Sequence, residues 1–173
     1  MIVSVRKRRA PSRMTKTPVP QSQPPEPRTP VRLLADGRVE VTFPDGLLGF
    51  PNCHRFVLSS YEPEDGGHSP FLTFHCQDED LSFPLLDPRL LVTDYQFPLA
   101  PDVLTYLKAR TAEELSILAI VTVRDRVEDT TMNLRGPLII NFHARCGLQL
   151  VLEHFPLRHP LFVPGEHRLV ATK

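Results

Sequence analysis

Alternating apolar and polar positions mark several short strands along the chain. Residues 38–43 (RVEVTF) place Val39, Val41 and Phe43 on one face, which is the period-two pattern of a half-buried strand. Other short runs are rich in β-branched and aromatic side chains, and turn-forming residues lie at both ends of each run. These runs predict further strands at residues 54–60, 70–76, 80–86, 138–142 and 148–153.

Two other segments complete the predicted fold. Residues 115–123 (LSILAIVTV) are apolar on both faces, which predicts a central strand buried on both sides. One helix is expected at residues 101–110, with a proline near its start and Asp102 as its cap. Thr111 and Glu114 form a capping-box pattern, which predicts a second brief helical turn. The sequence therefore predicts a mainly β fold, a small antiparallel β-barrel-like domain with one or two short helices.

Charge divides the chain into two parts. Residues 1–30 hold seven basic residues and one acidic residue, Glu26, whereas residues 31–173 hold 13 basic and 19 acidic residues. The first part has seven of the 19 prolines and no aromatic residue, so it cannot bury enough apolar surface to fold. We therefore expect a disordered, proline-rich basic tail at residues 1–30 and an acidic folded body at residues 31–173.

Several interpretations of the tail remain open. It can be a solvated extension, a nucleic-acid or nuclear-localisation patch at RKRR (residues 6–9), or an organelle transit peptide. No apolar segment follows the basic residues, which disfavours a secretory signal, and no apolar run is long enough to span a membrane. The acidic body is a poor match for nucleic-acid phosphates and a better match for a basic partner.

The candidates for chemistry are few. Cys53, Cys76 and Cys146 are odd in number and widely spaced, so we expect reduced thiols in a cytoplasmic protein rather than disulfides or a zinc ribbon. A β-barrel enzyme that uses Cys146 with His143 or His154 is the alternative hypothesis. The histidines lack the local spacing of a metal site, so no metal or other cofactor is expected. In DGLLGF, Gly46 and Gly49 are expected to take positive φ in a turn.

Five segments in sequence order carry a family resemblance. They are FPDGLLGFPNCHRFVL, DPRLLVTDYQFPL, LAIVTVRD, TTMNLRGPLIIN and GLQLVLEHFPLRHPL. Their combination and spacing resemble the flagellar assembly factor FliW family over residues 38–161. The specificity lies in the assembly of the motifs, because each one alone is only a strand and a turn.

The resemblance implies a protein without enzymatic activity. FliW-like proteins have a small β-barrel-like fold and bind two partners, cytoplasmic flagellin and the translational regulator CsrA. CsrA is a small basic RNA-binding dimer that represses flagellin synthesis. When flagellin is exported, the freed FliW-like protein captures CsrA, so the protein acts as a partner switch through linked binding equilibria. We expect a cytoplasmic monomer with no direct nucleic-acid or membrane partner.

Two groups of site residues follow. The matched motif positions are expected to be structural, with Asn133 and Asn141 bonded to backbone at strand ends. These positions are Asp45, Gly46, Gly49, Phe50, Asn133, Pro137, Asn141 and Gln149. Charge, and not the family, suggests that CsrA contacts acidic loops formed by Glu62, Glu64, Asp65, Asp78, Glu79 and Asp80. Arg158 and His159, near the end of the folded body, are further partner-binding candidates.

Overall fold

The computed structural model describes residues 38–62, 67 and 69–162. The predicted tail at residues 1–30 and the predicted start of the body at residue 31 lie outside the described residues. Alternating burial in the first strand agrees with the sequence pattern, because Val39 and Val41 are buried while their neighbours are exposed.

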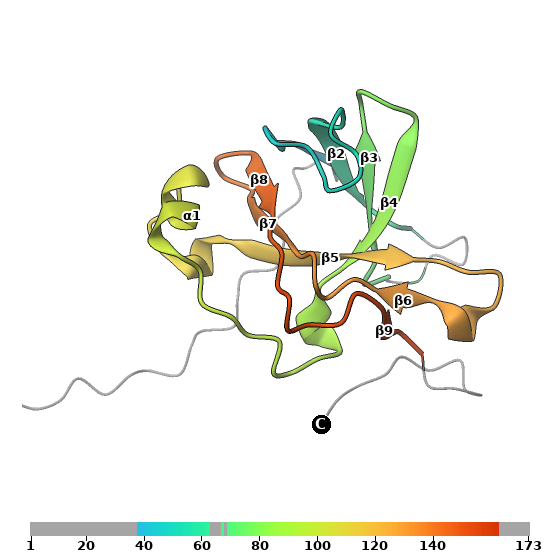
Figure 1. Cartoon of the computed structure of the whole chain (residues 1–173). Helices are drawn as coiled ribbons and strands as arrows, with labels where there is room; N and C mark the ends of the chain where they lie inside the picture. The colour runs from blue at the N-terminus through green and yellow to red at the C-terminus, as the bar shows by residue number, and fades with distance from the viewer. Residues whose placement is uncertain (1–37, 63–66, 68, 163–173) are drawn as a thin grey trace, which may run out of the picture.

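Short strands account for most of the regular structure (Figure 1). The strands are β1 (Arg38–Thr42), β2 (Arg55–Ser60), β3 (Leu72–Cys76), β4 (Leu81–Leu86), β5 (Ser116–Thr122), β6 (Thr131–Met132), β7 (Leu138–Asn141), β8 (Cys146–Gln149) and β9 (His159–Pro160). The helical segments are α1 (Pro101–Tyr106) and the 3₁₀ turns η1 (Pro88–Leu90), η2 (Ala112–Glu114) and η3 (Val127–Asp129). The predicted mainly β fold is confirmed.

Seven strands close into a barrel in the order β1–β2–β3–β4–β5–β7–β8, and β8 returns to β1. The closing contact pairs Thr42 with Cys146, and the N–H of Thr42 donates to the carbonyl of Arg145 at 3.0 Å. This closing pair is parallel, so the predicted antiparallel barrel holds for every pair in the ring except one. The exception follows from the topology, because an odd number of strands cannot close with only antiparallel neighbours.

The predicted central strand is confirmed in β5, which belongs to two sheets. Its first half pairs with β7, while Val121 and Thr122 pair with β6, which in turn pairs with β9. Pairing between β5 and β4 is limited to two residue pairs, Leu85 with Ile120 and Leu86 with Ala119. Pro84 precedes Leu85 in β4, and it has no backbone N–H to continue the pairing with β5. The two strands therefore separate beyond Leu85.

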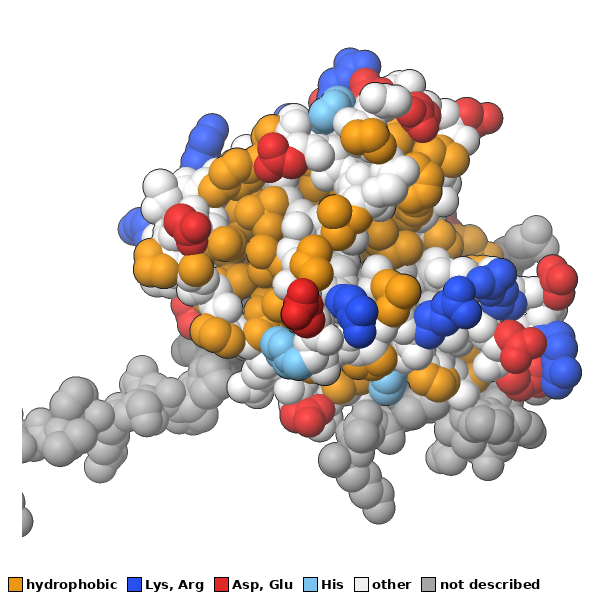
Figure 2. All heavy atoms as spheres, in the orientation of Figure 1, with side chains coloured by type: hydrophobic (Ala, Val, Ile, Leu, Met, Phe, Trp, Pro, Cys, Tyr) orange, Lys and Arg blue, Asp and Glu red, His pale blue; other side chains and the backbone are white. Residues whose placement is uncertain are grey.

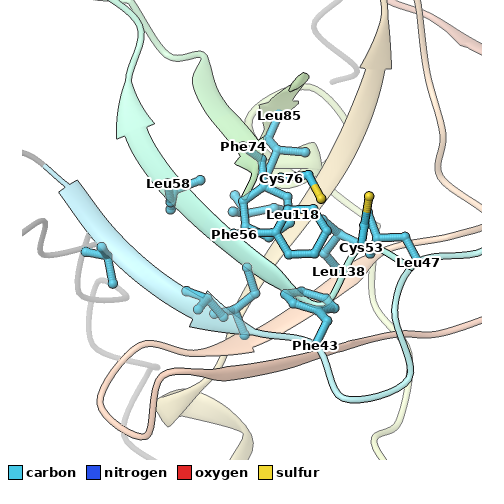
Figure 3. Close-up of a cluster of buried hydrophobic side chains, with 13 residues drawn as sticks. Phe43, Leu47, Cys53, Phe56, Leu58, Phe74, Cys76, Leu85, Leu118 and Leu138 are labelled. Atoms are coloured by element: carbon cyan, nitrogen blue, oxygen red, sulfur yellow. The ribbon is translucent and has the colours of Figure 1, made fainter. Parts of the chain in front are cut away.

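The barrel interior is filled by aromatic rings and aliphatic side chains (Figure 3). Phe56 and Phe74 are stacked with centroids 4.1 Å apart, and Phe43 meets both rings edge to face. Gly147 lies directly beneath Phe43, since a Cβ at that position would come within 2.4 Å of the ring. The absent side chain therefore lets β8 approach β1 closely enough to close the barrel.

The helix differs from its prediction in length and in its cap. α1 ends at Tyr106 rather than Arg110, and Lys108 takes a φ of 55° just beyond it. The N-cap is Ala100, so the prediction of Asp102 as the cap is wrong. At the other end of the helix, the carbonyl groups of Leu107 and Lys108 accept hydrogen bonds from the Asn141 amide, which holds this end against the barrel.

Two further local predictions need correction. The capping box does not form, because the Glu114 carboxylate accepts from the backbone N–H and Nε of Arg110 instead of closing on Thr111. The strand predicted at residues 148–153 is β8, which begins earlier, at Cys146, and ends at Gln149. Pairing ends there because its partner β7 begins at Leu138, after a proline.

Candidate partner-binding surfaces

A tight turn at residues 45–50 projects an apolar side chain from the barrel. Gly46 and Gly49 have φ values of 67° and 87°, which confirms the predicted positive φ at both glycines. Backbone bonds between Leu47 and Phe50 close the turn, and Phe50 packs edge to face on Phe83 of β4. At the tip of the turn, Leu48 is 60% exposed.

A polar frame holds this turn against the end of β8. The Gln149 side-chain oxygen accepts from the N–H of Leu48 at 2.9 Å, and its amide nitrogen donates to the carbonyl of Gly136 at 3.0 Å. The side-chain oxygen of Asn133 accepts from the N–H of Gly136. A Cβ at Gly136 would come within 2.9 Å of both amide groups, so this glycine lets the frame close. Asn133 therefore bonds to backbone at the end of β6, as predicted, and Gln149 bonds to the backbone of two separate segments.

An open apolar groove lies where β4 and β5 separate, and we call it the split groove. Its volume is about 470 Å³. Its apolar lining comes from five separate segments of the chain: Leu48, Phe50, Phe83, Pro84, Ile120, Val121, Val151 and Leu157. Its polar lining is Ser82, Thr122, Asn133, Arg135, Gly136 and Gln149.

Three apolar side chains of the split groove face solvent without cover. Leu48, Val151 and Leu157 are each more than half exposed. Figure 2 shows hydrophobic side chains gathered across the middle of the molecule, with Lys and Arg side chains grouped beside them where β5, β6 and β9 lie. Contiguous exposed apolar surface with a polar rim is typical of a protein-binding site.

A second groove, which we call the outer groove, shares the walls Pro84 and Val121 with the split groove. Its volume is about 270 Å³, and most of its other lining residues are apolar, with Tyr61, Phe71 and Phe162 among them. Both grooves therefore border the same separation between β4 and β5.

The acidic loops proposed from charge are only partly available for a partner. Asp78 lies in the turn between β3 and β4, where its carboxylate accepts from the backbone N–H groups of His54 and Arg55. The Arg55 side chain also pairs with it at 2.8 Å. Asp80 is exposed and Glu79 is half-buried. Asp78 therefore orders the start of β2, and its charge is already matched within the fold.

The hydrogen bonds to Asp78 also change its titration. The backbone N–H of Arg55, the backbone N–H of His54 and the Arg55 side chain together lower the pKa of Asp78 from 3.8 to about 2. Glu62 is exposed beyond the end of β2. Glu64 and Asp65, the other two residues of the proposed acidic set, lie outside the described residues.

Arg158 and His159 differ in their surroundings. Arg158 is exposed and lines a shallow hollow with Arg124, Asp125 and Asp129, among others. His159 is half-buried in the edge strand β9 and pairs with Met132 of β6. Burial lowers the pKa of the His159 ring, whose Nε2 has no hydrogen-bond partner among the described residues. Of the two candidates, only Arg158 offers a free charged group.

Three other motif residues make contacts within the fold. Asp45 accepts a hydrogen bond from the hydroxyl of Tyr106 in α1, at 2.8 Å. Asn141 is buried, and its side-chain oxygen accepts from the backbone N–H groups of His143 and Ala144 while its amide holds the end of α1. Pro137 is buried just before β7. These contacts confirm that Asn141 bonds to backbone at a strand end.

The Cys146–His143 enzyme hypothesis gains no support from the geometry. The thiol of Cys146 donates to the carbonyl of Leu107 at 3.4 Å, and the described residues show no hydrogen bond between it and His143. Burial raises the pKa of the Cys146 thiol, whereas a nucleophilic cysteine requires a lowered one. Cys53, Cys76 and Cys146 are all free thiols.

The part of the chain that the structure describes contains no candidate metal site. Within it, no three His, Cys, Asp or Glu side chains gather closely enough to hold a metal ion. In the same residues, no helix has the length and apolar character needed to cross a membrane.

The sequence did not reveal the split groove as a site. Phe50, Asn133 and Gln149 were identified as motif positions, but Leu48 and Val151 were not singled out. A weak signal was present, because Val151 stands out of phase with the inward residues Leu150 and Leu152 of the same segment. The fold and this surface together define a small closed β-barrel protein with an apolar groove at an opening between two of its strands.

Comparison with known proteins gives the family. The family model described as "FliW protein" matches residues 32–161, so this chain belongs to the FliW family. A flagellar assembly factor FliW from Natranaerobius thermophilus is 38% identical over 126 residues, which cover 70% of this chain and 81% of that protein. The FliW of Caldicellulosiruptor saccharolyticus is 33% identical over 141 residues, covering 76% and 90% respectively.

A solved structure supports the same conclusion. The crystal structure of a flagellar assembly factor FliW superposes with a TM-score of 0.64 at 27% sequence identity. The match covers 79% of this chain and 93% of the other. Both the sequence and the fold thus agree with a flagellar assembly factor.

Proposed function

We propose that this chain is a cytoplasmic, monomeric partner switch that binds flagellin and a CsrA-type translational regulator in turn. Free flagellin occupies the protein, and export of flagellin leaves it able to capture the regulator and relieve repression of flagellin synthesis. Such a switch needs two partners whose binding equilibria are coupled, and it needs no bond-making chemistry.

The observation that carries the proposal is the exposed apolar lining of the split groove. Leu48, Val151 and Leu157 are exposed. Leu48 is held by a turn and a polar frame, and backbone hydrogen bonds of Arg135 with Leu152 and Pro156 hold the segment that carries the other two. A rigid scaffold that presents uncovered aliphatic side chains is suited to bind a protein segment. We assign flagellin to this surface, which includes part of the apolar stretch at residues 157–161.

Acidic side chains outside the split groove support a separate place for the regulator. Glu62, Glu79 and Asp80 form no ion pair among the described residues, so their charge can attract a basic protein. Glu62 lies beyond the end of β2, whereas Glu79 and Asp80 lie beside its start, so the acidic candidates occupy opposite ends of the β2–β3 pair. Asp78 contributes by ordering the turn that carries Glu79 and Asp80. Arg158 and His159 belong instead to the edge beside the split groove.

Purified proteins provide the test. The wild-type chain should bind flagellin and the regulator separately, and added flagellin should displace the regulator from a preformed complex. The double variant Leu48→Asp with Val151→Asp should lose flagellin binding by at least about ten-fold while keeping its melting temperature, because it places charge in an apolar interface. The control is Thr93→Asp with Gln96→Asp, which adds the same charge at two exposed residues outside the groove.

The outcomes separate clearly. Failure of the wild-type chain to bind either partner would refute the proposal. Binding of flagellin that is equally strong in the groove variant and the control would remove flagellin from the split groove.

A further inference from the structure

We infer that the split groove selects a partner segment that combines apolar side chains with a carboxylate, and that Arg135 binds this carboxylate. This inference rests on the proposed function, because it gives the chemistry of a partner that the groove would hold. It also predicts that a basic segment is rejected at this surface.

The first step is the charge of the groove. Arg135 is the only charged side chain among the residues that line the split groove. Arg124 is likewise the only charged residue that lines the outer groove, on the other side of the same separation between β4 and β5. Both arginines lie in a body with 13 basic and 19 acidic residues, so composition alone would favour carboxylates here.

The second step is that Arg135 is positioned but not neutralised. Its Nε donates to the carbonyl of Phe155 at 3.1 Å, and its own backbone bonds to Leu152 and Pro156. No carboxylate lies within ion-pair distance of it among the described residues. By contrast, Arg55, Arg89, Arg110 and Arg126 each meet a carboxylate. The guanidinium of Arg135 is thus fixed on one side and can accept a carboxylate through its terminal nitrogens.

The third step concerns the neutral polar groups of the groove. Gln149 uses both its oxygen and its nitrogen on backbone groups of Leu48 and Gly136. The oxygen of Asn133 is used by the N–H of Gly136. Pro84 has no N–H, so β4 cannot extend a regular ladder to an added strand at this point. A bound segment would therefore be held by apolar contacts and by Arg135 rather than by strand addition.

Charge complementarity then fixes the class of occupant. An arginine at the edge of an apolar surface attracts a carboxylate and repels lysine and arginine. A strongly basic regulator is therefore a poor occupant of the split groove, and an acidic–apolar segment is a good one. The two partners of the proposed switch would meet surfaces of opposite character.

The test uses one arginine and two comparison variants. Arg135→Glu should weaken binding of flagellin at least about ten-fold, because it reverses the charge that faces the partner. Arg135→Lys keeps the charge but loses the bond from Nε and the paired terminal nitrogens, so it should bind more weakly than the wild-type chain and more tightly than Arg135→Glu. Arg145→Glu makes the same charge change at an exposed residue in the turn between β7 and β8, outside the groove, and should have little effect.

A second arm does not depend on flagellin. Peptides selected from a random library on the immobilised wild-type chain should be rich in leucine, isoleucine, valine and phenylalanine with aspartate or glutamate. Their binding should be lost with Arg135→Glu and kept with Arg145→Glu. Replacing the peptide carboxylate by lysine should restore binding to Arg135→Glu, which a merely structural role of Arg135 would not produce.

Several results would overturn the inference while leaving the proposed function intact. One is flagellin binding that is equal in Arg135→Glu and Arg145→Glu. Another is selection of basic peptides, or of none. A third is weaker binding of the regulator, rather than flagellin, to Arg135→Glu. Failure of the wild-type chain to bind flagellin would instead count against the proposed function, and the selected peptides would then decide the inference alone.

Discussion

The acidic turn at Asp78–Asp80 and the split groove use polar side chains in the same way but leave different surfaces exposed. In the turn, Asp78 accepts hydrogen bonds from the backbone at the start of β2, and the neighbouring carboxylates of Glu79 and Asp80 remain at the surface. In the groove, the Gln149 side chain bonds to the backbone of Leu48 and Gly136, and aliphatic side chains remain at the surface. A polar residue in a family motif can therefore shape a binding surface without touching the partner.

The largest effect in this comparison is expected for Gln149→Ala. The substitution leaves the N–H of Leu48 and the carbonyl of Gly136 without their side-chain partner, which should lower the free energy of unfolding by about 2 kcal/mol. Flagellin binding should fall as well, because the turn that carries Leu48 loses its anchor. Urea denaturation measures the first effect, and Gln96→Ala, at an exposed glutamine, is the control. Unchanged stability would show that water replaces both bonds.

A smaller, pH-dependent effect is expected at the acidic turn for Asp78→Asn. The folded-state pKa of about 2 lies below the ordinary 3.8, so the carboxylate contributes stability that is fully present above the ordinary value. That contribution is lost as pH falls from 3.8 towards about 2. Melting temperatures measured across this range should fall more steeply for the wild-type chain than for Asp78→Asn. Parallel curves would mean that Asp78 is not ordered by Arg55 in solution.

The sequence predicted the barrel because its information is local and periodic. Residues 38–43 and 115–123 became β1 and β5 since alternation and continuous apolarity report burial directly. The groove could not be predicted in the same way, because Leu48, Phe83 and Val151 come together only when the ring closes. The contacts of Asp78 could not be predicted for a related reason, since His54 and Arg55 lie at the start of the neighbouring strand β2.

The next prediction separates the two charged surfaces kinetically. Glu79→Lys with Asp80→Lys, which leaves Asp78 intact, should slow association of the regulator and make it less sensitive to salt. Screening limits such attraction to about 8 Å at physiological salt, so dissociation should change less than association. Surface-based kinetics over a salt series measures both rates, and flagellin is the matched second partner. Equal damage to both partners would contradict the assignment of separate surfaces.

Adding Asp78→Lys to this pair sharpens the distinction between structure and recognition. Charge alone would predict that reversal of Asp78, Glu79 and Asp80 leaves the turn folded. The bonds from Asp78 to His54 and Arg55 instead predict a lower melting temperature for the triple variant than for the double variant. Circular dichroism melts of the two variants decide between these expectations.

The smallest effect is expected from deletion of residues 1–30. We propose that this proline-rich basic segment is a disordered tail, since its composition gives it little apolar surface to bury. Its removal should leave the melting temperature and the affinity for both partners nearly unchanged. Differential scanning fluorimetry and the same binding assays measure this, and a large fall in melting temperature would show that the tail packs on the body.

The parallel pair that closes the barrel has a consequence for the order in which the chain can fold. Thr42 of β1 pairs with Cys146 of β8, so β1 has no second neighbouring strand until β8 has been synthesised. The antiparallel run from β1 to β4 can form from local contacts, whereas closure requires a loop of about a hundred residues and is slow by comparison. On the ribosome, the sheet of β1–β4 therefore remains open until β8 has been synthesised. The split groove, which needs β8 and the segment beyond it, is completed last.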